Sequence, residues 1–327
     1  MMAGISADVL PLVDSLSSLM EGGKRLRPAF AYWGYRSTGA EDNDQIVSAC
    51  ASLEFLQACA LIHDDVMDDS DTRRGKPAAH KQFVALHDSH SWNNSAVRFG
   101  DGAAILIGDL ALSWADEMLM SSGLKSEQLT RAKRIYDIMR TELMAGQYLD
   151  LLEQVRGNTT VESSQTVIRY KSAKYTIERP LHMGANIAGA GAHHLQILSD
   201  YGLALGEAFQ LRDDVLGVFG DAIVTGKPAG DDIREGKQTM LVAYTQSLAS
   251  ESALNTFNTK FGQDNLDTDD IEALQEIISE SGALAQVESQ IEALTALALD
   301  SLQDSTIDKD AREALQLLAI MATKRAT

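Results

Sequence analysis

The fold is decided by one long apolar stretch at residues 46–63, which reads IVSACASLEFLQACALIH. The stretch is apolar on nearly every side and too long for a strand, so it predicts a helix that is buried on most of its surface. Its two cysteines, Cys50 and Cys59, fall on nearly opposite faces of such a helix. We therefore expect neither a disulfide nor a metal pair between them, which fits a reducing cytoplasm.

Apolar residues recur at helical spacing through most of the remaining chain, and alternating segments of the kind that form strands are missing. Further helices are expected at 25–36, 95–120, 126–152, 161–189, 196–219, 284–297 and 310–325. Chain breakers cluster at 70–95 and 220–238, yet neither stretch has the composition of a linker. The sequence predicts an all-α fold in a single domain, residues 1–327.

The chain carries 28 Lys and Arg residues against 47 Asp and Glu residues, for a formal net charge of −19. Sequence-independent nucleic-acid binding depends on Lys and Arg replacing phosphate counterions, so no nucleic-acid partner is expected. The N-terminal residues MMAGISADVLP have no basic segment before an apolar one, which predicts no signal peptide. Acidic residues interrupt apolar windows such as 102–120, so we expect a cytoplasmic protein that is not integral to a membrane.

An acidic cluster follows the apolar stretch, in the sequence HDDVMDDSDTRRG at residues 63–75. Because successive helical residues turn by about 100°, Asp64, Asp65 and Asp68 fall within one sector of the helix. Three crowded carboxylates repel one another unless cations lie between them, and Mg²⁺ is the cation that best suits oxygen ligands and phosphates. The alternative is a solvated helix end, but a buried helix before the cluster and paired arginines after it favour a metal site.

A second acidic pair, Asp213 and Asp214, lies in FQLRDDVLG at residues 209–217, again after an apolar helical run. Alone, this pair is equally typical of a solvated helix end. Together with the first cluster it is far more specific, because carboxylates on separate helices are a recurring way to hold several metal ions in a bundle.

Basic residues accompany each acidic element. Three cations occur in GGKRLRP at residues 22–28, and the others lie at Arg73 and Arg74, at Lys171, and in GKPAGDD at 226–232 followed by Lys237. Arg and Lys are suited to diphosphate oxygens. This pairing indicates a site for two phosphorylated molecules, one held through metal ions and one held directly by cations.

These motifs, in this order, resemble those of the trans-isoprenyl diphosphate synthases, the polyprenyl synthetase family, from Gly22 to about residue 245. The family motifs are GGKRLRP, DDxxD followed by RRG, Lys-Ser or Lys-Thr, FQxxDD and GKPxGxDxxxGK. The resemblance implies a bundle of antiparallel helices around a central cavity, assembled as a homodimer. It also implies a prenyltransferase that condenses isopentenyl diphosphate head-to-tail with an allylic diphosphate.

The resemblance further implies a role for each matching residue. Three Mg²⁺ ions would be bound by Asp64, Asp65, Asp68 and Asp213, with support from Asp214. The diphosphate of the allylic substrate, which is dimethylallyl, geranyl or farnesyl diphosphate, would contact Arg73, Lys171, Gln210, Lys227 and Lys237. Isopentenyl diphosphate would contact Lys24, Arg27, Gln57 and Arg74.

One position departs from the family pattern, since the second DDxxD motif ends here in Gly217. Asp221 would replace the missing carboxylate through water if the helix continued that far. A catalytically silent subunit is the alternative that this departure raises. A terpene cyclase is disfavoured, because its second motif carries Asn, Ser and Glu and it needs no second diphosphate grip.

Product length in this family depends on the residues just before the first aspartate cluster. Here those residues are Ala60 and Cys59, which are small, with Leu56 one turn deeper as part of a floor. Bulky aromatic residues at these positions stop chain growth early, so a farnesyl product is disfavoured. We expect geranylgeranyl diphosphate, with farnesyl or longer polyprenyl products as the alternatives.

Overall fold

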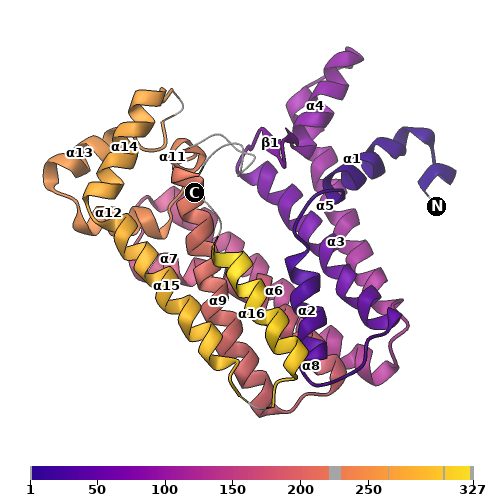
Figure 1. The fold of residues 1–327 in the computed structure, drawn as a ribbon. Coiled ribbons are helices and arrows are strands. Elements are labelled where there is room, and N and C mark those ends of the chain that lie inside the picture. Colours follow the sequence, from indigo (N-terminus) through magenta and orange to yellow (C-terminus); the bar gives the residue numbers. More distant parts are fainter. Residues whose placement is uncertain (1, 221–229, 264, 305, 325–327) are drawn as a thin grey trace. The chain divides into compact units, whose positions relative to one another are not determined.

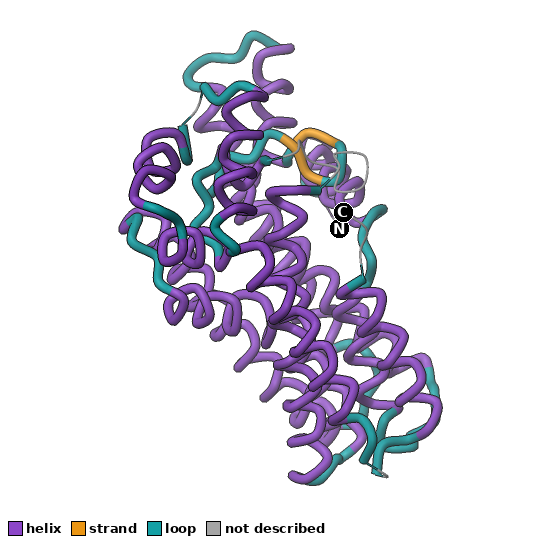
Figure 2. The backbone as a smooth tube through the Cα atoms, turned by 60° about the vertical axis from the view of Figure 1, so that its left-hand side comes forward, coloured by secondary structure: helices purple, strands orange, loops and turns teal. Residues whose placement is uncertain are grey.

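The computed structural model describes residues 2–220, 230–263, 265–304 and 306–324. These residues form helices joined by short loops, with one two-stranded hairpin, as the purple and orange segments of Figure 2 show. The prediction of an all-α fold is confirmed. Figure 1 labels the elements along the chain.

The chain divides into two compact units. Unit 1 contains Met1–Pro28 and Asn43–Leu124, and unit 2 contains Ala29–Asp42 and Lys125–Thr327. The prediction of a single domain stays a prediction. Each unit has a core of its own and is described separately.

Unit 1 is built around α3 and α5. Its elements are η1 (Met2–Gly4), η2 (Ala7–Val9), α1 (Leu10–Met20), α3 (Asp44–Met67), β1 (Thr72–Arg73), β2 (Lys76–Pro77), α4 (Ala79–Ser89) and α5 (Ala96–Met120). The side chain of Asn43 accepts a hydrogen bond from the backbone N–H of Ile46 and so caps α3. The predicted buried helix at 46–63 is therefore the middle of α3, which packs against α5.

The helix α3 is long and apolar enough to cross a membrane by length and composition, but half of its most apolar window is buried inside the protein. Cys59 and Ile62 pack with Ala104 and Ile107 of α5 in one core cluster. Burial of this kind is typical of a core helix. Cys50 and Cys59 are both free and buried, as predicted, and burial raises the pKa of the Cys59 thiol to about 11.

The stretch 70–95 holds a helix that the pattern of chain breakers did not predict. In α4, the side chains of Ala79 and Phe83 are buried in the same cluster as α5, and His80 is buried beside them. The apolar face is short, so its periodicity is weak in the sequence. Packing against α5 stabilises the helix.

Unit 2 is built around α9, which packs against α15 and against η3. Its elements are most of α2 (Leu26–Arg36), then α6 (Ser126–Arg156), α7 (Val161–Val167), η3 (Ile168–Glu178), α8 (Arg179–Ala188), α9 (Ala192–Phe219), α11 (Asp231–Arg234), α12 (Met240–Leu248), α13 (Glu251–Lys260), α14 (Thr268–Glu280), α15 (Ala283–Ser301) and α16 (Lys309–Thr323). Leu211 and Val215 of α9 pack with Val287 and Ile291 of α15 in its core, and Figure 1 shows the two helices side by side.

The single helix predicted at 161–189 is three segments, of which η3 is a π-helix. Two glycines allow neighbouring helices to approach it closely. A Cβ at Gly146 of α6 would lie 2.4 Å from the backbone nitrogen of Lys171, and one at Gly206 of α9 would lie 2.5 Å from the Cα of Ala173. The widened helix is thus clamped on two sides at the residues around Lys171.

The helices α2 and α8 also meet through glycines. A Cβ at Gly184 would lie 1.8 Å from the carbonyl oxygen of Ala31, and one at Gly34 would lie 2.3 Å from the carbonyl oxygen of Leu181. A real Cβ does not approach backbone this closely, so the two helix backbones are in contact only because both positions lack a side chain.

Gly184→Ala is therefore expected to destabilise the chain by about 1 to 3 kcal/mol, because a methyl group overpacks a backbone contact that cannot yield. Gly191→Ala is the control, since the space around Gly191 is open and its φ of −80° suits any residue. It is expected to change stability by no more than about 0.5 kcal/mol. Urea unfolding measures both, and equal effects would contradict the close approach.

Candidate active site

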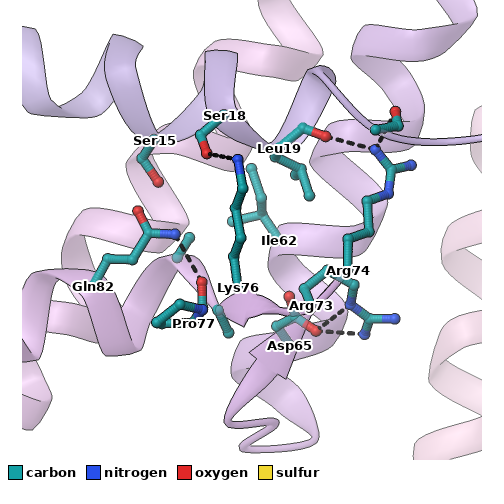
Figure 3. A pocket seen from close by; sticks show the side chains of 13 residues that line it. Ser15, Ser18, Leu19, Ile62, Asp65, Arg73, Arg74, Lys76, Pro77 and Gln82 are labelled. Atoms are coloured by element: carbon teal, nitrogen blue, oxygen red, sulfur yellow. Dashed lines mark hydrogen bonds and ion pairs between the residues drawn. The ribbon is translucent and has the colours of Figure 1, made fainter. Parts of the chain in front are cut away.

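The first aspartate cluster, Asp64, Asp65 and Asp68, lies at the C-terminal end of α3. Asp65 is only 2% exposed. The Nε of Arg73 in β1 donates to Asp65 Oδ1 at 2.7 Å, and Arg73 Nη2 lies 3.5 Å from Asp64 Oδ2. The hairpin therefore brings Arg73 back onto the helix that carries the carboxylates, as Figure 3 shows for Asp65.

The charges of this cluster depend on one another. Burial raises the pKa of Asp65, and the Arg73 guanidinium acts against that shift while Asp64 adds to it. Burial alone would lower the pKa of Arg73, but Asp65, Asp64 and Asp68 together hold it above its usual range. Arg73 thus keeps its charge in a partly buried position.

Arg74 occupies the turn of the hairpin. Its φ of 56° and the φ of 73° at Gly75 are both left-handed, as a tight two-residue turn requires. Its Nη1 donates to the carbonyl oxygens of Leu19 at 2.5 Å and Gly22 at 2.6 Å (Figure 3). A Cβ at Gly23 would lie 2.5 Å from Arg74 Nη2, so the glycine pair leaves room for this guanidinium.

The two basic motifs of unit 1, GGKRLRP at residues 22–28 and the pair Arg73-Arg74, are close enough to interact. Burial lowers the pKa of Arg74, with Glu54 acting in the opposite direction, and the charges of Arg25, Arg73 and Arg27 lower it further. Arg25 itself pairs with Glu54 and donates to the carbonyl oxygen of Met20. Arg25, which was not assigned to the site, thus braces the basic loop.

A pocket of about 70 Å³ lies beside the first aspartate cluster, lined by Asp65, Arg73 and Arg74 among others (Figure 3). Gln57 and Arg74 line a second, smaller pocket. The structure thus brings together Gln57 and Arg74, two of the four residues that the sequence assigned to one diphosphate, and Arg27 acts on Arg74 through its charge. Lys24 lies in the loop before α2.

In unit 2, Lys171 and Ser172 lie on η3. Lys171 Nζ donates to Asp150 Oδ2 of α6 at 2.6 Å. Ser172 Oγ donates to Gln210 Oε1 at 2.5 Å, and Gln210 Nε2 donates to Asp214 Oδ1 at 2.7 Å. Gln210 therefore connects η3 to the second aspartate pair.

The second aspartate pair sits near the end of α9, and its members differ in burial. Asp214 is buried, whereas Asp213 is partly accessible. Burial raises the pKa of Asp214 to about 8; the bond from Gln210 opposes this shift, and the neighbouring Asp232 and Asp213 add to it. Asp213 is thus the more accessible carboxylate of the pair.

The helix α9 ends at Phe219, because Gly220 is extended, with φ of −70° and ψ of 147°. The helix therefore does not continue to Asp221, as the water-bridged replacement of the missing carboxylate would need. Asp221 and Lys227 both lie outside the described residues. Lys237 follows α11 and lies 3.9 Å from Glu235, measured from Nζ to Oε2.

The residues predicted to set product length differ in burial. Leu56 and Cys59 are fully buried, and Cys59 packs against α5, whereas Ala60 is only partly buried. Ala60 is one turn before Asp64 on the same face. Of the three, Ala60 is therefore the position with room for a larger side chain.

The donors present fit Mg²⁺. Among the described residues, no three acidic, histidine or cysteine side chains converge closely enough to hold a metal ion by themselves. Mg²⁺ is usually bound through one or two carboxylates together with water and substrate phosphates, so a complete protein cage is not needed. Within unit 1, Asp64 and Asp68 supply carboxylates one turn apart at the end of α3.

Sequence reasoning missed three contacts made by motif residues. Glu54 pairs with Arg25, Asp150 pairs with Lys171, and Ser172 of the Lys-Ser motif donates to Gln210. Asp150 is separated from Lys171 by a helix end and a loop, so no local pattern connects the two. For Glu54 and Asp150, the sequence did carry one signal, which is a carboxylate on an otherwise apolar helical face.

Comparison with known proteins gives consistent matches over most of the chain. The model of the polyprenyl synthetase family matches residues 11–278. The crystal structure of geranylgeranyl pyrophosphate synthase from Corynebacterium glutamicum, complexed with isoprenyl diphosphate and magnesium, is 44% identical with a TM-score of 0.96, over 99% of this chain and 93% of that one.

Curated relatives make products of different lengths. The geranylfarnesyl diphosphate synthase of Aeropyrum pernix is 34% identical over 310 residues, 93% of this chain and 91% of that one. The octaprenyl diphosphate synthase of Escherichia coli strain K12 is 31% identical over 336 residues, 99% of this chain and 95% of that one.

The helical fold and these matches define the class as a prenyl diphosphate synthase, which is a transferase. The chain belongs to the polyprenyl synthetase family, and the resemblance drawn from its motifs is confirmed.

Arg73→Gln is expected to destabilise the chain by about 3 to 5 kcal/mol, because it leaves Asp65 as an uncompensated buried charge. Without Arg73 the folded-state pKa of Asp65 rises further above its unfolded value. Between those two values only the folded state binds the proton, so the loss of stability grows as the pH rises. Urea unfolding should show a larger deficit at pH 8 than at pH 5.

The control for this prediction is the double variant Arg73→Gln with Asp65→Asn, which removes the buried charge and should recover most of the lost stability. A deficit that is the same at both pH values, together with no recovery in the double variant, would contradict the charge-based explanation.

Proposed function

We propose that this chain is a Mg²⁺-dependent prenyltransferase that condenses isopentenyl diphosphate head-to-tail with an allylic diphosphate and releases diphosphate. The observation that carries the proposal is the pairing of Arg73 with Asp64 and Asp65 of the first aspartate cluster in unit 1; in unit 2, Gln210 links Ser172, next to Lys171, to Asp214 of the second aspartate pair. The relative from Corynebacterium glutamicum, with isoprenyl diphosphate and magnesium bound, supports it.

The allylic diphosphate is proposed to be held through three Mg²⁺ ions and directly by cations. The ions would be bound by Asp64, Asp65, Asp68 and Asp213, with Asp214 in support. The same diphosphate, carried by a dimethylallyl, geranyl or farnesyl group, would contact Arg73, Lys171, Gln210, Lys227 and Lys237. Bound Mg²⁺ neutralises charge on the diphosphate and so makes it a better leaving group.

Isopentenyl diphosphate is proposed to bind to Lys24, Arg27, Gln57 and Arg74. The proximity of Gln57 to Arg74 supports this assignment, as does the electrostatic interaction of Arg27 with Arg74. A separate binding site is chemically useful, because the diphosphate of isopentenyl diphosphate remains attached to the product while the allylic diphosphate leaves.

The reaction follows from that division. Lys171 and Arg73 stabilise the charge that develops on the departing diphosphate, while the allylic carbon–oxygen bond breaks to give a delocalised carbocation. The double bond of isopentenyl diphosphate forms the new carbon–carbon bond with that cation. A proton is then lost from the adjacent carbon to the released diphosphate. Apolar walls exclude water, which would otherwise capture the cation.

The product is proposed to be geranylgeranyl diphosphate. Cys59 and Ala60 are small, and the larger Leu56 lies one turn deeper along α3. The names of the relatives include geranylgeranyl, geranylfarnesyl and octaprenyl diphosphate synthases, so farnesyl and longer products are the alternatives to be distinguished by experiment.

The active form is proposed to be a cytoplasmic homodimer in which residues 1–327 act as one domain. The exposed apolar side chains on α5 support self-association. Val97, Ile105 and Leu106 are all exposed there, although α5 is otherwise a core helix. A second copy of the chain would remove these side chains from water.

The first test is an assay of the purified chain with radiolabelled isopentenyl diphosphate, Mg²⁺ and each allylic primer. The wild type is expected to make labelled prenyl diphosphates. Asp64→Asn and Asp68→Asn should each lower the rate by roughly 100-fold or more, because charge stabilisation of the leaving group is lost. Asp69→Asn is the control, since Asp69 is exposed and pairs with Lys81. No product from a folded wild type would make a silent subunit the better interpretation.

Ala60→Phe is expected to shift the products toward shorter chains, because an aromatic ring on the face of Asp64 shortens the space for the growing tail. Val47→Phe is the matched control, since Val47 is exposed near the start of α3. Cys59→Phe is a weaker test, because Cys59 is packed in the core and the variant would be strained. Chromatography of dephosphorylated products measures the shift, and an unchanged pattern in folded, active Ala60→Phe would refute this account of product length.

A further inference from the structure

A short segment of unit 2, residues 230–237, lies between α9 and the helices α13 and α14. The segment contains α11, which packs against α9, and it ends at Lys237. On the side of α9, a Cβ at Gly217 would lie 2.0 Å from Oδ2 of Asp232. Two further contacts come from α13 and α14, which carry none of the sequence motifs. Figure 1 shows these two helices side by side, with α11 next to them.

The first of these contacts is at the start of the segment. Gly230 leads into α11 with a left-handed backbone, at a φ of 72°. A Cβ at Gly230 would lie 2.6 Å from Cγ2 of Ile271, so this side chain of α14 packs directly on the glycine backbone. Ile271 is buried in the same core cluster as Ile233 of α11. The start of the segment is therefore fixed against α14.

The second contact joins the end of the segment to the residues that follow α13. Gly236 and Gly262 are both left-handed, with φ of 66° and 74°. A Cβ at Gly236 would lie 3.0 Å from the Cα of Gly262, and one at Gly262 would lie 3.1 Å from the Cα of Gly236. Both N–H groups donate to the carbonyl oxygen of Ile233, at 3.3 Å from Gly236 and 3.0 Å from Gly262. The two backbones thus touch one residue before Lys237.

Gly262 is itself held in place by the core. Phe257 of α13 is fully buried, and its ring stacks on that of Phe261 with 4.8 Å between the ring centroids. The backbone N–H of Phe261 donates to the carbonyl oxygen of Phe257 at 2.8 Å. Lys260 forms an ion pair with Asp270 of α14, which ties the two helices together. Because Gly262 follows Phe261 directly, this packing fixes its backbone.

The position of Lys237 depends on the glycine before it. The backbone N–H of Lys237 donates to the carbonyl oxygen of Asp232 at 2.9 Å, which closes the turn around Gly236. Burial raises the pKa of Asp214, and the bond from Gln210 and the charge of Lys237 oppose that shift, so Lys237 acts on the second aspartate pair. A displaced Gly236 backbone would move the base of the Lys237 side chain relative to that pair.

We propose that Gly262 is a positioning residue, whose backbone contact with Gly236 sets the place of Lys237. This inference rests on the proposed function, which assigns Lys237 to the diphosphate of the allylic substrate. Gly262 lies outside the family motifs and is assigned to no substrate, so its effect on the reaction passes through Lys237. Displacement of a binding group by about 1 Å lowers a rate by up to about 100-fold, so a contact remote from the chemistry is enough to matter.

Gly262→Ala is expected to lower kcat/KM for the allylic diphosphate by about 5- to 20-fold, because its Cβ displaces the backbone of Gly236 and with it Lys237. The KM for isopentenyl diphosphate should change by less than about 2-fold, since Lys237 is not assigned to that substrate. Kinetics are measured on the full chain with Mg²⁺, radiolabelled isopentenyl diphosphate and farnesyl diphosphate as the allylic substrate.

Gly282→Ala is the matched control for this variant. Gly282 is also left-handed, with a φ of 86°, but nothing lies within 4 Å of a Cβ built there. The control therefore carries the same kind of backbone strain without the contact. It should lose stability in urea unfolding and keep kcat/KM within about 2-fold of the wild type.

A double-mutant cycle with Lys237→Ala separates positioning from a general loss of stability. In the Lys237→Ala background, Gly262→Ala should cost no further activity, because the side chain that Gly262 positions is gone. Its effect on urea unfolding should persist in that background. If the alanine variant does not fold, Gly262→Asn replaces it, since Asn adopts the left-handed conformation more readily while its Cβ still meets Gly236.

Three outcomes would overturn the inference. Wild-type kcat/KM in a folded Gly262 variant shows that the contact does not place Lys237. Equal losses of activity with and without the Lys237 side chain show that Gly262 acts through stability or through another residue. Both of these results leave the proposed function intact, whereas a wild type that makes no prenyl product overturns the proposed function and this inference with it.

Discussion

Buried carboxylates are costly unless a cation or a donor compensates them, and this constraint organises the region around each aspartate cluster. Asp65 is paired with Arg73, Asp150 with Lys171, and Asp214 with Gln210. Arg73 and Lys171 reach their carboxylates from a different element, so these two pairs also tie elements together, whereas Gln210 and Asp214 both lie on α9.

Glycine makes these partnerships geometrically possible. Gly22 and Gly23 leave room for the guanidinium of Arg74, and Gly146 allows α6 to touch the backbone of η3 at Lys171. Gly217 admits the carboxylate of Asp232 by the same principle. In each case a charged or backbone group from elsewhere in the same unit fills the space of the missing side chain. The glycine therefore both permits close packing and admits a polar group.

The same pairs reconcile an acidic protein with phosphate chemistry. The net charge of −19 opposes binding of an anion at long range. Near α3, however, Arg25, Arg27, Arg73 and Arg74 are close enough that three of them lower the pKa of the fourth. Local placement of cations, rather than total charge, is therefore what suits the chain to diphosphates.

Much of the fold and most of the candidate catalytic residues could be predicted, because the sequence signals for them are local. The length and nearly uniform apolar character of 46–63 identified α3, and the spacing of Asp64, Asp65 and Asp68 put their side chains in one sector, since a helix repeats about every 3.6 residues. Periodicity did not predict α4, whose short apolar face is stabilised by α5, or the π-helix at Lys171, which lies between α6 and α9. It also did not predict α12, α13 and α14.

The sequence by itself determined the family, the order of the motifs and the chemistry that their residue types permit. Only the tertiary structure decided which charges are partners. Arg25 braces Glu54 instead of extending the phosphate grip, Cys59 faces the core while Ala60 stays partly accessible, and Asp232 reaches the face of α9 left open by Gly217. The physical reason is that helix formation depends on neighbours three or four residues apart, whereas the environment of a charge depends on groups that are distant in sequence and close in space.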